Sequence, residues 1–206
     1  MNLEWHLRSD GGEELPAFAR RPASPVRVAS TSVLGGGIGR RSWFLNASVP
    51  AGYPGDDPAT DLRALAAGVG LEGDGVGMLT AKDVRAVVLE EDDGVRVAAT
   101  VGLGWPTWAA AADEDPRGAG VGTINVLAVV PAALGDAALV NAVATVTEAK
   151  VQALLEAGVD GTGTASDAVC VAALDGGGPE PYGGPRSRWG APLARAVHRA
   201  VLRGTR

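Results

Sequence analysis

Four residues in the second half of the chain are of types that can together hydrolyse an amide. They lie on or near the predicted strands of that half. Thr123 stands at the start of one apolar run, Asp167 directly precedes another, and Lys150 lies between them. A hydroxyl nucleophile, a carboxylate or amine that accepts its proton, and an amide or backbone N–H groups as oxyanion donors form a set that needs no histidine. We therefore predict Thr123, Lys150, Asp167 and Asn125 as catalytic residues. Threonine at the start of a strand is also typical of β-propensity alone, so a purely structural role stays open.

The scarcity of histidine narrows the chemistry further. The only histidines are His6, in an irregular-looking N-terminal segment, and His198, on an arginine-rich terminal helix. A Ser-His-Asp triad or a zinc site needs histidine at its centre, so we expect neither, and no metal. A metal-dependent hydrolase is the weaker alternative. Lys82 and Lys150 are the only lysines, and neither follows a glycine, which excludes a Walker A phosphate loop.

The elements that must position these residues are a strand, a helix and a second strand. Val126–Val130 and Ala168–Leu174 are continuous apolar runs, the pattern of strands covered on both faces. The segment from Asp136 predicts a helix of about twenty residues between them, long enough to return the chain parallel to itself. Parallel strands would place Thr123 and Asp167 in one crevice, where ligands tend to bind in such sheets.

The helix from Asp136 would aim Lys150 inward. On a helical wheel one broad apolar arc holds Leu139, Val143, Val146, Val151 and Leu154. Lys150 falls in the middle of this arc, and an inward ammonium group is unfavourable unless it is paired or lines a cavity. Lys150 could be such a site cation, or its stem could pack at the edge of the face while its amine reaches solvent. The opposite arc holds Asn141, Thr145, Glu148, Gln152 and Glu156.

The rest of the sequence predicts one α/β domain at residues 26–206. We expect the N-terminal segment that precedes it, residues 1–25, to form a hairpin or an edge strand. Asp57-Pro58 resembles a helix start, because proline is favoured in the first turn. Further strands are predicted at Val26–Leu34, Trp43–Val49, Val76–Thr80, Val84–Leu89 and Val95–Val101. Helices are predicted at Ala59–Ala67 and Gly190–Arg203, a loop at Gly35–Gly39 and a hairpin turn at Asp93-Gly94. Together they predict a mixed sheet with a central strand-helix-strand crossover.

Composition excludes several classes of function. The net charge is −6 without a basic stripe, which argues against a nucleic-acid partner. No apolar run approaches the roughly eighteen residues of a membrane helix, and the charged N-terminus does not read as a signal peptide. The single cysteine, Cys170, allows no internal disulfide, so we expect a cytoplasmic protein. The Gly-x-Gly units at Gly35, Gly75, Gly102, Gly118 and Gly161 lack the third glycine of a dinucleotide-binding loop, so no such cofactor is expected.

Six short motifs in a fixed order resemble the adenosylcobinamide amidohydrolase family. They are S-T-S-V-L-G-G-G-I-G from Ser30 with Asn46 after it, M-L-T-A from Met78, A-T-V-G-L-G from Ala99, G-T-I-N from Gly122, T-E-A-K from Thr147 and T-G-T-A-S-D from Thr162. The motifs spread over most of the chain and are specific as an ordered set rather than singly. The last motif departs from the family pattern, because Ser166 stands where a threonine is expected, although the hydroxyl group is kept.

This resemblance implies an enzyme of corrinoid salvage. It would hydrolyse the amide between aminopropanol and a propionate side chain of adenosylcobinamide, giving adenosylcobyric acid for cobalamin synthesis. The corrinoid would be the substrate, and no cofactor is implied. We predict the following substrate-binding residues: Gly36, Gly37, Asn46, Thr80, Thr100, Trp105, Glu148, Thr162, Thr164 and Ser166. Trp43 and Trp108 could complete a flat aromatic wall with Trp105. A corrinoid-binding or carrier module without the chemistry is the alternative.

A fainter resemblance concerns the mechanism. The order of Gly-Thr, apolar strand, long helix, glycine-rich turn, Ser-Asp and apolar strand is similar to ornithine acetyltransferase-like proteins, which implies a layered αββα fold. In those proteins a Ser or Thr at the strand start becomes the nucleophile after self-cleavage of the chain. By this analogy Thr123 is the nucleophile, with or without cleavage. In an intact chain Lys150 or Asp167 would have to act as the base.

Overall fold

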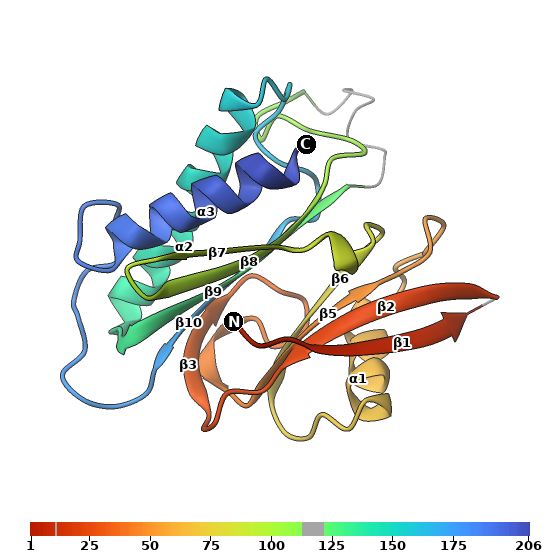
Figure 1. The fold of residues 1–206 in the computed structure, drawn as a ribbon, viewed down its shortest axis with the longest axis horizontal. Coiled ribbons are helices and arrows are strands. Elements are labelled where there is room, and N and C mark those ends of the chain that lie inside the picture. Colours follow the sequence, from red (N-terminus) through yellow and green to blue (C-terminus); the bar gives the residue numbers. More distant parts are fainter. Residues whose placement is uncertain (11, 113–121) are drawn as a thin grey trace.

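Two stacked β-sheets form the centre of the protein, whose computed structural model describes residues 1–10, 12–112 and 122–206 (Figure 1). Within these residues one sheet has four strands in the order β1-β2-β5-β6, and the other has six in the order β4-β3-β10-β9-β8-β7. The first sheet consists of β1 (Glu4–Asp10), β2 (Glu13–Arg20), β5 (Trp43–Ser48) and β6 (Gly75–Thr80). The second consists of β3 (Val26–Ser30), β4 (Gly37–Arg41), β7 (Val88–Asp92), β8 (Val95–Gly102), β9 (Thr123–Ala133) and β10 (Ala168–Leu174).

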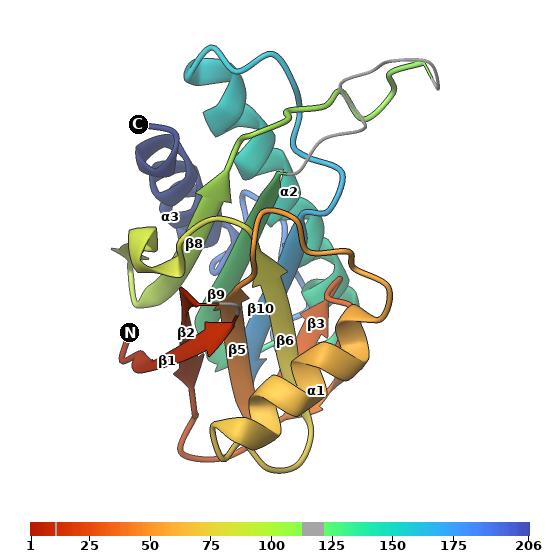
Figure 2. The ribbon, with the colours of Figure 1, turned by 90° about the vertical axis from the view of Figure 1, so that its right-hand side faces the viewer.

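Helices cover the two outer faces of the stacked sheets (Figure 2). α2 (Asp136–Glu156) and α3 (Gly190–Gly204) pack on the six-stranded sheet, and α1 (Pro58–Gly68) packs on the four-stranded sheet. A third apolar cluster, which includes Phe44 and Leu127, fills the space between the sheets. Among the described residues, no helix combines the length and the apolar character needed to span a membrane. The predicted α/β fold with αββα layers is confirmed.

The predicted strand-helix-strand crossover is also confirmed. β9 and β10 are parallel neighbours joined through α2, and Asn125 pairs with Ala168 in their register. Their starts therefore lie at the same edge of the six-stranded sheet, which brings Thr123 and Asp167 together. β8 runs antiparallel to β9 on its other side, so the sheet is mixed.

The layer between the sheets changes from apolar to polar along its length. Side chains alternate across a strand, so Thr123 and Asn125 of β9 point to the same side as Leu127, which belongs to the cluster between the sheets. Neighbouring and facing strands add further buried polar residues at this end, namely Asn46, Ser48, Thr80 and Thr100. Hydroxyl and amide groups are thus gathered at one end of an otherwise apolar layer.

Three local predictions are confirmed as well. Residues 1–25 contain the antiparallel hairpin β1–β2, which joins the four-stranded sheet through β5. Asp57 caps α1 by accepting a hydrogen bond from the Thr60 N–H at 3.0 Å. Asp93 and Gly94 turn the chain between β7 and β8 with φ of 48° and 81°, the left-handed conformation that tight hairpin turns require.

Three predicted boundaries are wrong. The strand predicted at Val26–Leu34 ends at Ser30, where β3 stops. Gly35–Gly39 is not wholly a loop, because β4 covers its second half and pairs with β3. The strand predicted at Val84–Leu89 starts later, after a turn of 3₁₀ helix at Val84–Ala86. Asp83 stabilises this turn, because its carboxylate accepts a hydrogen bond from the Arg85 N–H at 2.8 Å.

The helical wheel of α2 is right for Lys150 and wrong for Thr145. Lys150 is 6% exposed, as expected of an inward residue, and Glu148 is exposed. Thr145 is buried too, because the segment at Gly183, which precedes α3, packs against this side of α2. The Thr145 hydroxyl lies 3.0 Å from the carbonyl oxygen of Asn141 and 2.9 Å from that of Gly183, so its polar group is satisfied inside the protein.

Candidate active site

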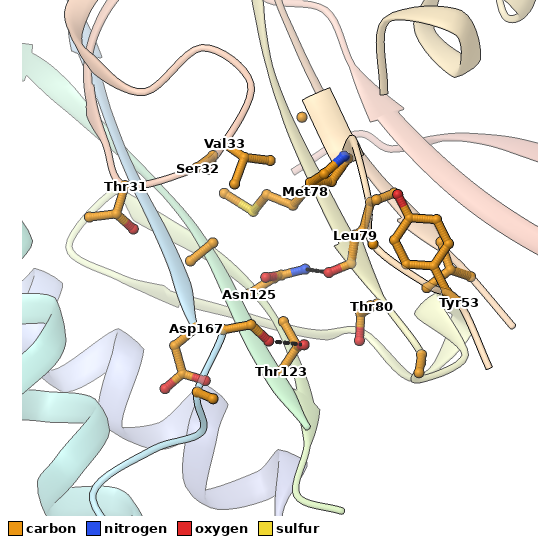
Figure 3. A pocket seen from close by; sticks show the side chains of 18 of the residues that line it. Thr31, Ser32, Val33, Tyr53, Met78, Leu79, Thr80, Thr123, Asn125 and Asp167 are labelled. Atoms are coloured by element: carbon orange, nitrogen blue, oxygen red, sulfur yellow. Dashed lines mark hydrogen bonds between the residues drawn. The ribbon is translucent and has the colours of Figure 1, made fainter. Parts of the chain in front are cut away.

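A cavity of about 490 Å³ opens between the two sheets at the polar end of their interface (Figure 3). Thr123, Asn125 and Asp167 line it from the side of the six-stranded sheet, and Met78–Ala81 lines it from the end of β6. The loop Thr31–Val33, which follows β3, forms another wall. Its volume is within the range typical of small-molecule sites. Three of the four residues predicted as catalytic therefore share one cavity.

A second hollow of about 380 Å³ adjoins the first. It is lined by Lys82, Gly102–Gly104 and Gly122, and it shares Thr80 and Thr123 with the larger cavity. Thr123 therefore stands at the junction of the two hollows.

The hydroxyl group of Thr123 is hydrogen-bonded to Ser166. Their side-chain oxygens are 2.8 Å apart, and Ser166 Oγ lies 2.9 Å from the carbonyl oxygen of Gly122. When Ser166 donates its only proton to that carbonyl, the Thr123 hydroxyl donates to Ser166. Thr123 is 8% exposed, so this contact holds its hydroxyl group in one orientation at the cavity wall.

Lys150 and Asp167 form a buried ion pair, in which Lys150 Nζ donates to Asp167 Oδ2. Asp167 also accepts hydrogen bonds from the Ile124 N–H at 2.9 Å and from the Thr164 hydroxyl and N–H at 2.6 and 3.2 Å. These donors offset the penalty for burying the carboxylate. Within the described residues neither member of the pair is hydrogen-bonded to Thr123. The pair instead connects α2, the start of β9 and the loop before β10.

Close packing around the ion pair explains the glycine of the T-G-T motif. A Cβ atom at Gly163 would lie 2.4 Å from both Asp167 Oδ2 and Lys150 Nζ. No larger residue fits there without separating the two charges.

Asn125 connects the two sheets beside the cavity. Its amide nitrogen donates to Asn46 Oδ1 at 2.9 Å and to the carbonyl oxygen of Leu79 at 3.0 Å. Asn46 in turn donates to Thr100 Oγ1 at 3.1 Å. Both amide hydrogens of Asn125 are therefore used inside the protein, which leaves none for the predicted role of oxyanion donor. Its side-chain oxygen is buried without a hydrogen-bond partner among the described residues.

The other predicted substrate-binding threonines and Ser166 divide into two groups. Thr80 and Ser166 line the cavity. Thr162 and Thr164 do not, and they stabilise neighbouring loops instead. The Thr162 hydroxyl oxygen accepts a hydrogen bond from the Ala109 N–H at 3.0 Å, and Thr164 contacts Asp167.

Two predicted glycines and Glu148 also lie outside the lining of both hollows. Gly36 lies in the turn between β3 and β4, and Gly37 is the first residue of β4, with a φ of 80°. A Cβ atom at Gly36 would lie 2.5 Å from the carbonyl oxygen of Ser32, so this glycine permits the shape of a loop that does line the cavity. Glu148 is exposed on α2.

The predicted tryptophan wall is not formed. Trp43 is buried between the four-stranded sheet and α1, where its indole N–H donates to the carbonyl oxygen of Gly73 at 3.0 Å. Trp105 is 48% exposed and lines neither hollow. Trp108 donates to Asp160 Oδ1 at 2.8 Å. Burial of Trp43 on the far side of its sheet is what prevents the three rings from sharing a surface.

Tyr53 is the aromatic residue that lines the cavity, and the sequence reasoning missed it (Figure 3). It lies between β5 and α1, and its hydroxyl group donates to the Asp61 carboxylate of α1. Burial, reinforced by the hydrogen bond to Asp61 and by nearby acidic residues, raises the pKa of Tyr53 to about 12. The only signal for it in the sequence is an aromatic residue within a Gly- and Pro-rich turn, a type of loop that often carries function.

Comparison with known proteins gives matches over nearly the whole chain. The family model described as adenosylcobinamide amidohydrolase matches residues 6–206. A protein named adenosylcobinamide amidohydrolase from Methanosarcina mazei is 32% identical over 185 residues, which are 85% of this chain and 88% of the relative. Another protein of that name, from Halobacterium salinarum, is 40% identical over 147 residues, which are 68% of this chain and 62% of the relative.

Proposed function

Because the chain belongs to the adenosylcobinamide amidohydrolase family, we propose that it hydrolyses the amide joining aminopropanol to a propionate arm of adenosylcobinamide. One water is consumed, and the products are aminopropanol and adenosylcobyric acid, which re-enters cobalamin synthesis. The observation that carries this proposal is the position of the Thr123 hydroxyl group, at the junction of two hollows and at the polar end of the inter-sheet layer. The single, unpaired cysteine supports a cytoplasmic location for the reaction.

Thr123 is the nucleophile in this proposal. Its Oγ1 forms a bond to the amide carbonyl carbon, aminopropanol leaves with a proton on its nitrogen, and water then hydrolyses the ester that remains. Ser166 orients the attacking hydroxyl group through their 2.8 Å hydrogen bond. Lys150 and Asp167 are positioning residues, because their ion pair fixes the start of β9 at Ile124 and the loop that carries Ser166.

A corrinoid is larger than the cavity, so only the arm that bears the amide needs to enter it. The rim of the cavity is formed by loops that carry Val33, which is 64% exposed, and Tyr53. A third hollow of about 350 Å³ continues past Tyr53 along α1. The ring system lies across this rim in our proposal, against Tyr53 and Val33, while the amide reaches Thr123.

Release of aminopropanol from adenosylcobinamide, measured by mass spectrometry, tests the proposed activity. Replacing Thr123 by Ala removes the bond-forming atom and should lower kcat by about a thousandfold or more. The matched control is Thr147→Ala, because Thr147 is exposed on α2 and, among the described residues, its hydroxyl is hydrogen-bonded only to the carbonyl oxygen of Val143. Near-normal turnover by the Thr123 variant would remove Thr123 from this role. Binding of the corrinoid without release would favour a carrier module.

A further inference from the structure

Among the described residues, Thr80 and Thr123 are the two that bring a hydroxyl group to both hollows. Thr80 ends β6 and Thr123 begins β9, so they come from different sheets. Figure 3 shows their hydroxyl groups at the same end of the cavity. The cavity has further hydroxyl groups at Thr31, Ser32 and Ser166, but these residues do not line the second hollow. A carbonyl group that Thr123 attacks at the junction is therefore close to Thr80.

The Thr80 hydroxyl group is held by one hydrogen bond and keeps its proton free. Its oxygen accepts the Lys82 N–H at 3.1 Å. A hydroxyl group has one proton to donate, and within the described part of the chain no acceptor is hydrogen-bonded to the proton of Thr80. Accepting the bond from Lys82 polarises the hydroxyl group and makes it a stronger donor. The residue is 2% exposed, so this donor is available to a molecule in the cavity and shielded from bulk water.

Asn125 fixes the position of Thr80 relative to Thr123. Asn125 lies two positions after Thr123 on β9, and its amide nitrogen donates to the carbonyl oxygen of Leu79 at 3.0 Å. Leu79 directly precedes Thr80, so this hydrogen bond joins the end of β6 to the start of β9. A donor that is fixed before the reaction stabilises developing charge without the penalty of rearrangement.

The other donors near Thr123 are already engaged. Both amide hydrogens of Asn125 are used inside the protein, and Lys150 is held in its buried ion pair. Ser166 Oγ lies 2.9 Å from the carbonyl oxygen of Gly122, which takes up its proton. Thr80 is thus the donor that remains at the junction for the oxyanion of an acyl transfer.

We propose that the Thr80 hydroxyl group donates a hydrogen bond to the carbonyl oxygen of the scissile amide while Thr123 attacks its carbon. As Thr123 Oγ1 bonds to that carbon, the electron pair of the C=O double bond moves to the oxygen, and Thr80 stabilises the resulting oxyanion. The electron pair returns when the C–N bond breaks, and the proton of Thr123 ends on the departing nitrogen. The same donor acts again when water attacks the ester. This role rests on the proposed amide hydrolysis and makes Thr80 a catalytic residue.

Release of aminopropanol from adenosylcobinamide, followed by mass spectrometry over a range of substrate concentrations, tests this role in the full-length protein. Thr80→Val keeps the shape of the side chain but removes the donor, so it should lower kcat by about a hundredfold to a thousandfold. KM should change by less than about threefold, because the lost interaction belongs to the transition state. Thr80→Ser keeps a hydroxyl group and should retain most of kcat.

Ser48→Ala is the matched control, because Ser48 stabilises the turn after β6 without lining either hollow. Ser48 pairs with Thr80 in the four-stranded sheet and is 3% exposed. Its hydroxyl group accepts the Val84 N–H at 3.1 Å and donates to the carbonyl oxygen of Lys82 at 3.1 Å. Its loss removes no interaction with the reacting atoms, so kcat should stay within about threefold of that of the unaltered protein. Circular dichroism checks that each variant is folded.

A folded Thr80→Val variant with nearly normal kcat, in a preparation whose unaltered protein releases aminopropanol, overturns the role of Thr80 and leaves the proposed function standing. Equal losses of kcat in Thr80→Val and Ser48→Ala overturn it too, because they assign Thr80 a structural role. So does a loss that appears only as a raised KM, or a Thr80→Ser variant as slow as Thr80→Val. No release by the unaltered protein overturns both the proposed function and this role.

Discussion

Lys150 can stay charged inside the protein because Asp167 lies against it. The lysine is 6% exposed, and moving an unpaired ammonium group into such an environment is strongly unfavourable. The pair offsets this penalty only while both members are present. Removing one member leaves the other charge buried and uncompensated.

Replacing Lys150 by Met should therefore lower the free energy of unfolding by about 3–5 kcal/mol. Urea unfolding followed by circular dichroism measures the loss. The matched control uses the other lysine, since Lys82 is exposed and Lys82→Met should change stability by no more than about 0.5 kcal/mol. Equal losses in the two variants would contradict a special role for the buried pair.

Tyr53 offers a second prediction at the scale of single residues. If its ring contacts the substrate, Tyr53→Ala should raise KM by about tenfold with little change in kcat, because the lost contact is the same in the ground state and the transition state. Tyr53→Phe should retain most of the affinity. The control is the chain's other tyrosine, Tyr182, which is 72% exposed. A Tyr53→Ala variant with unchanged KM would place the ring system elsewhere.

Sequence patterns identify some site residues and miss others for a physical reason. Thr123, Asp167 and Lys150 stand out because strand ends and a helical wheel are local patterns. The Asn125 amide could not be assigned in this way, because its partners Asn46 and Leu79 come from the other sheet. Tyr53 was missed because a loop carries no periodicity from which its orientation follows.

At the scale of elements, α3 is joined to the β7–β8 hairpin by a group of charges. Arg195 and Arg199 contact Asp92, and Arg199 and Arg203 contact Glu90. The hydrogen bond from Arg195, followed by that from Arg199, lowers the pKa of Asp92 against the opposing effect of burial. For Glu90, burial raises the pKa but is outweighed by hydrogen bonds from Arg203 and Arg199, so its pKa is lowered as well.

These lowered pKa values predict a loss of stability in acid. Asp and Glu ordinarily titrate at about pH 3.9 and 4.3, so the unfolded chain takes up protons before the folded one does. The contribution of Asp92 and Glu90 to the free energy of unfolding is complete above these pH values. It is lost as the pH falls toward the lowered pKa values of the folded state. The urea concentration at the midpoint of unfolding should therefore decrease when the pH is lowered below about 4.5. This decrease should be smaller in Arg199→Gln, which keeps fewer of the contacts. Arg186→Gln, at an exposed position, is the control. An equally steep fall in both variants would assign the acid sensitivity to other carboxyl groups.

The elements themselves were predictable to the extent that their signals are local. The helix cap at Asp57, the turn at Asp93-Gly94 and the β9–α2–β10 crossover are each encoded within a continuous stretch. The four-stranded sheet is different, because β2 pairs with β5 across β3 and β4, which belong to the other sheet. No periodicity within a strand specifies its neighbour, so that sheet could be found only in the structure.

At the scale of the whole molecule, the two sheets enclose the protein's single cysteine. Cys170 of β10 is buried in the apolar cluster between the sheets, and burial raises the pKa of its thiol to about 12. Both effects suppress its reactivity, because the thiolate is the reactive form and reagents cannot reach it.

Labelling of Cys170 by a thiol reagent should therefore require the sheets to separate. We expect labelling in increasing urea to follow the unfolding curve, and a corrinoid that binds the folded state should slow it. Cys170→Ala provides the blank, since no other thiol is present. Rapid labelling in the absence of denaturant, without loss of circular dichroism, would contradict a closed interface between the sheets.

The layered architecture also divides the chain into parts with different tolerance to change. The strand that carries Thr123 and Asn125, β9, lies in one of the two inner layers, whereas the cavity rim at Val33 and Ala51 is exposed. Randomising those rim positions leaves the apolar clusters intact. A library built there can therefore be screened for hydrolysis of other bulky amides on a scaffold that still folds.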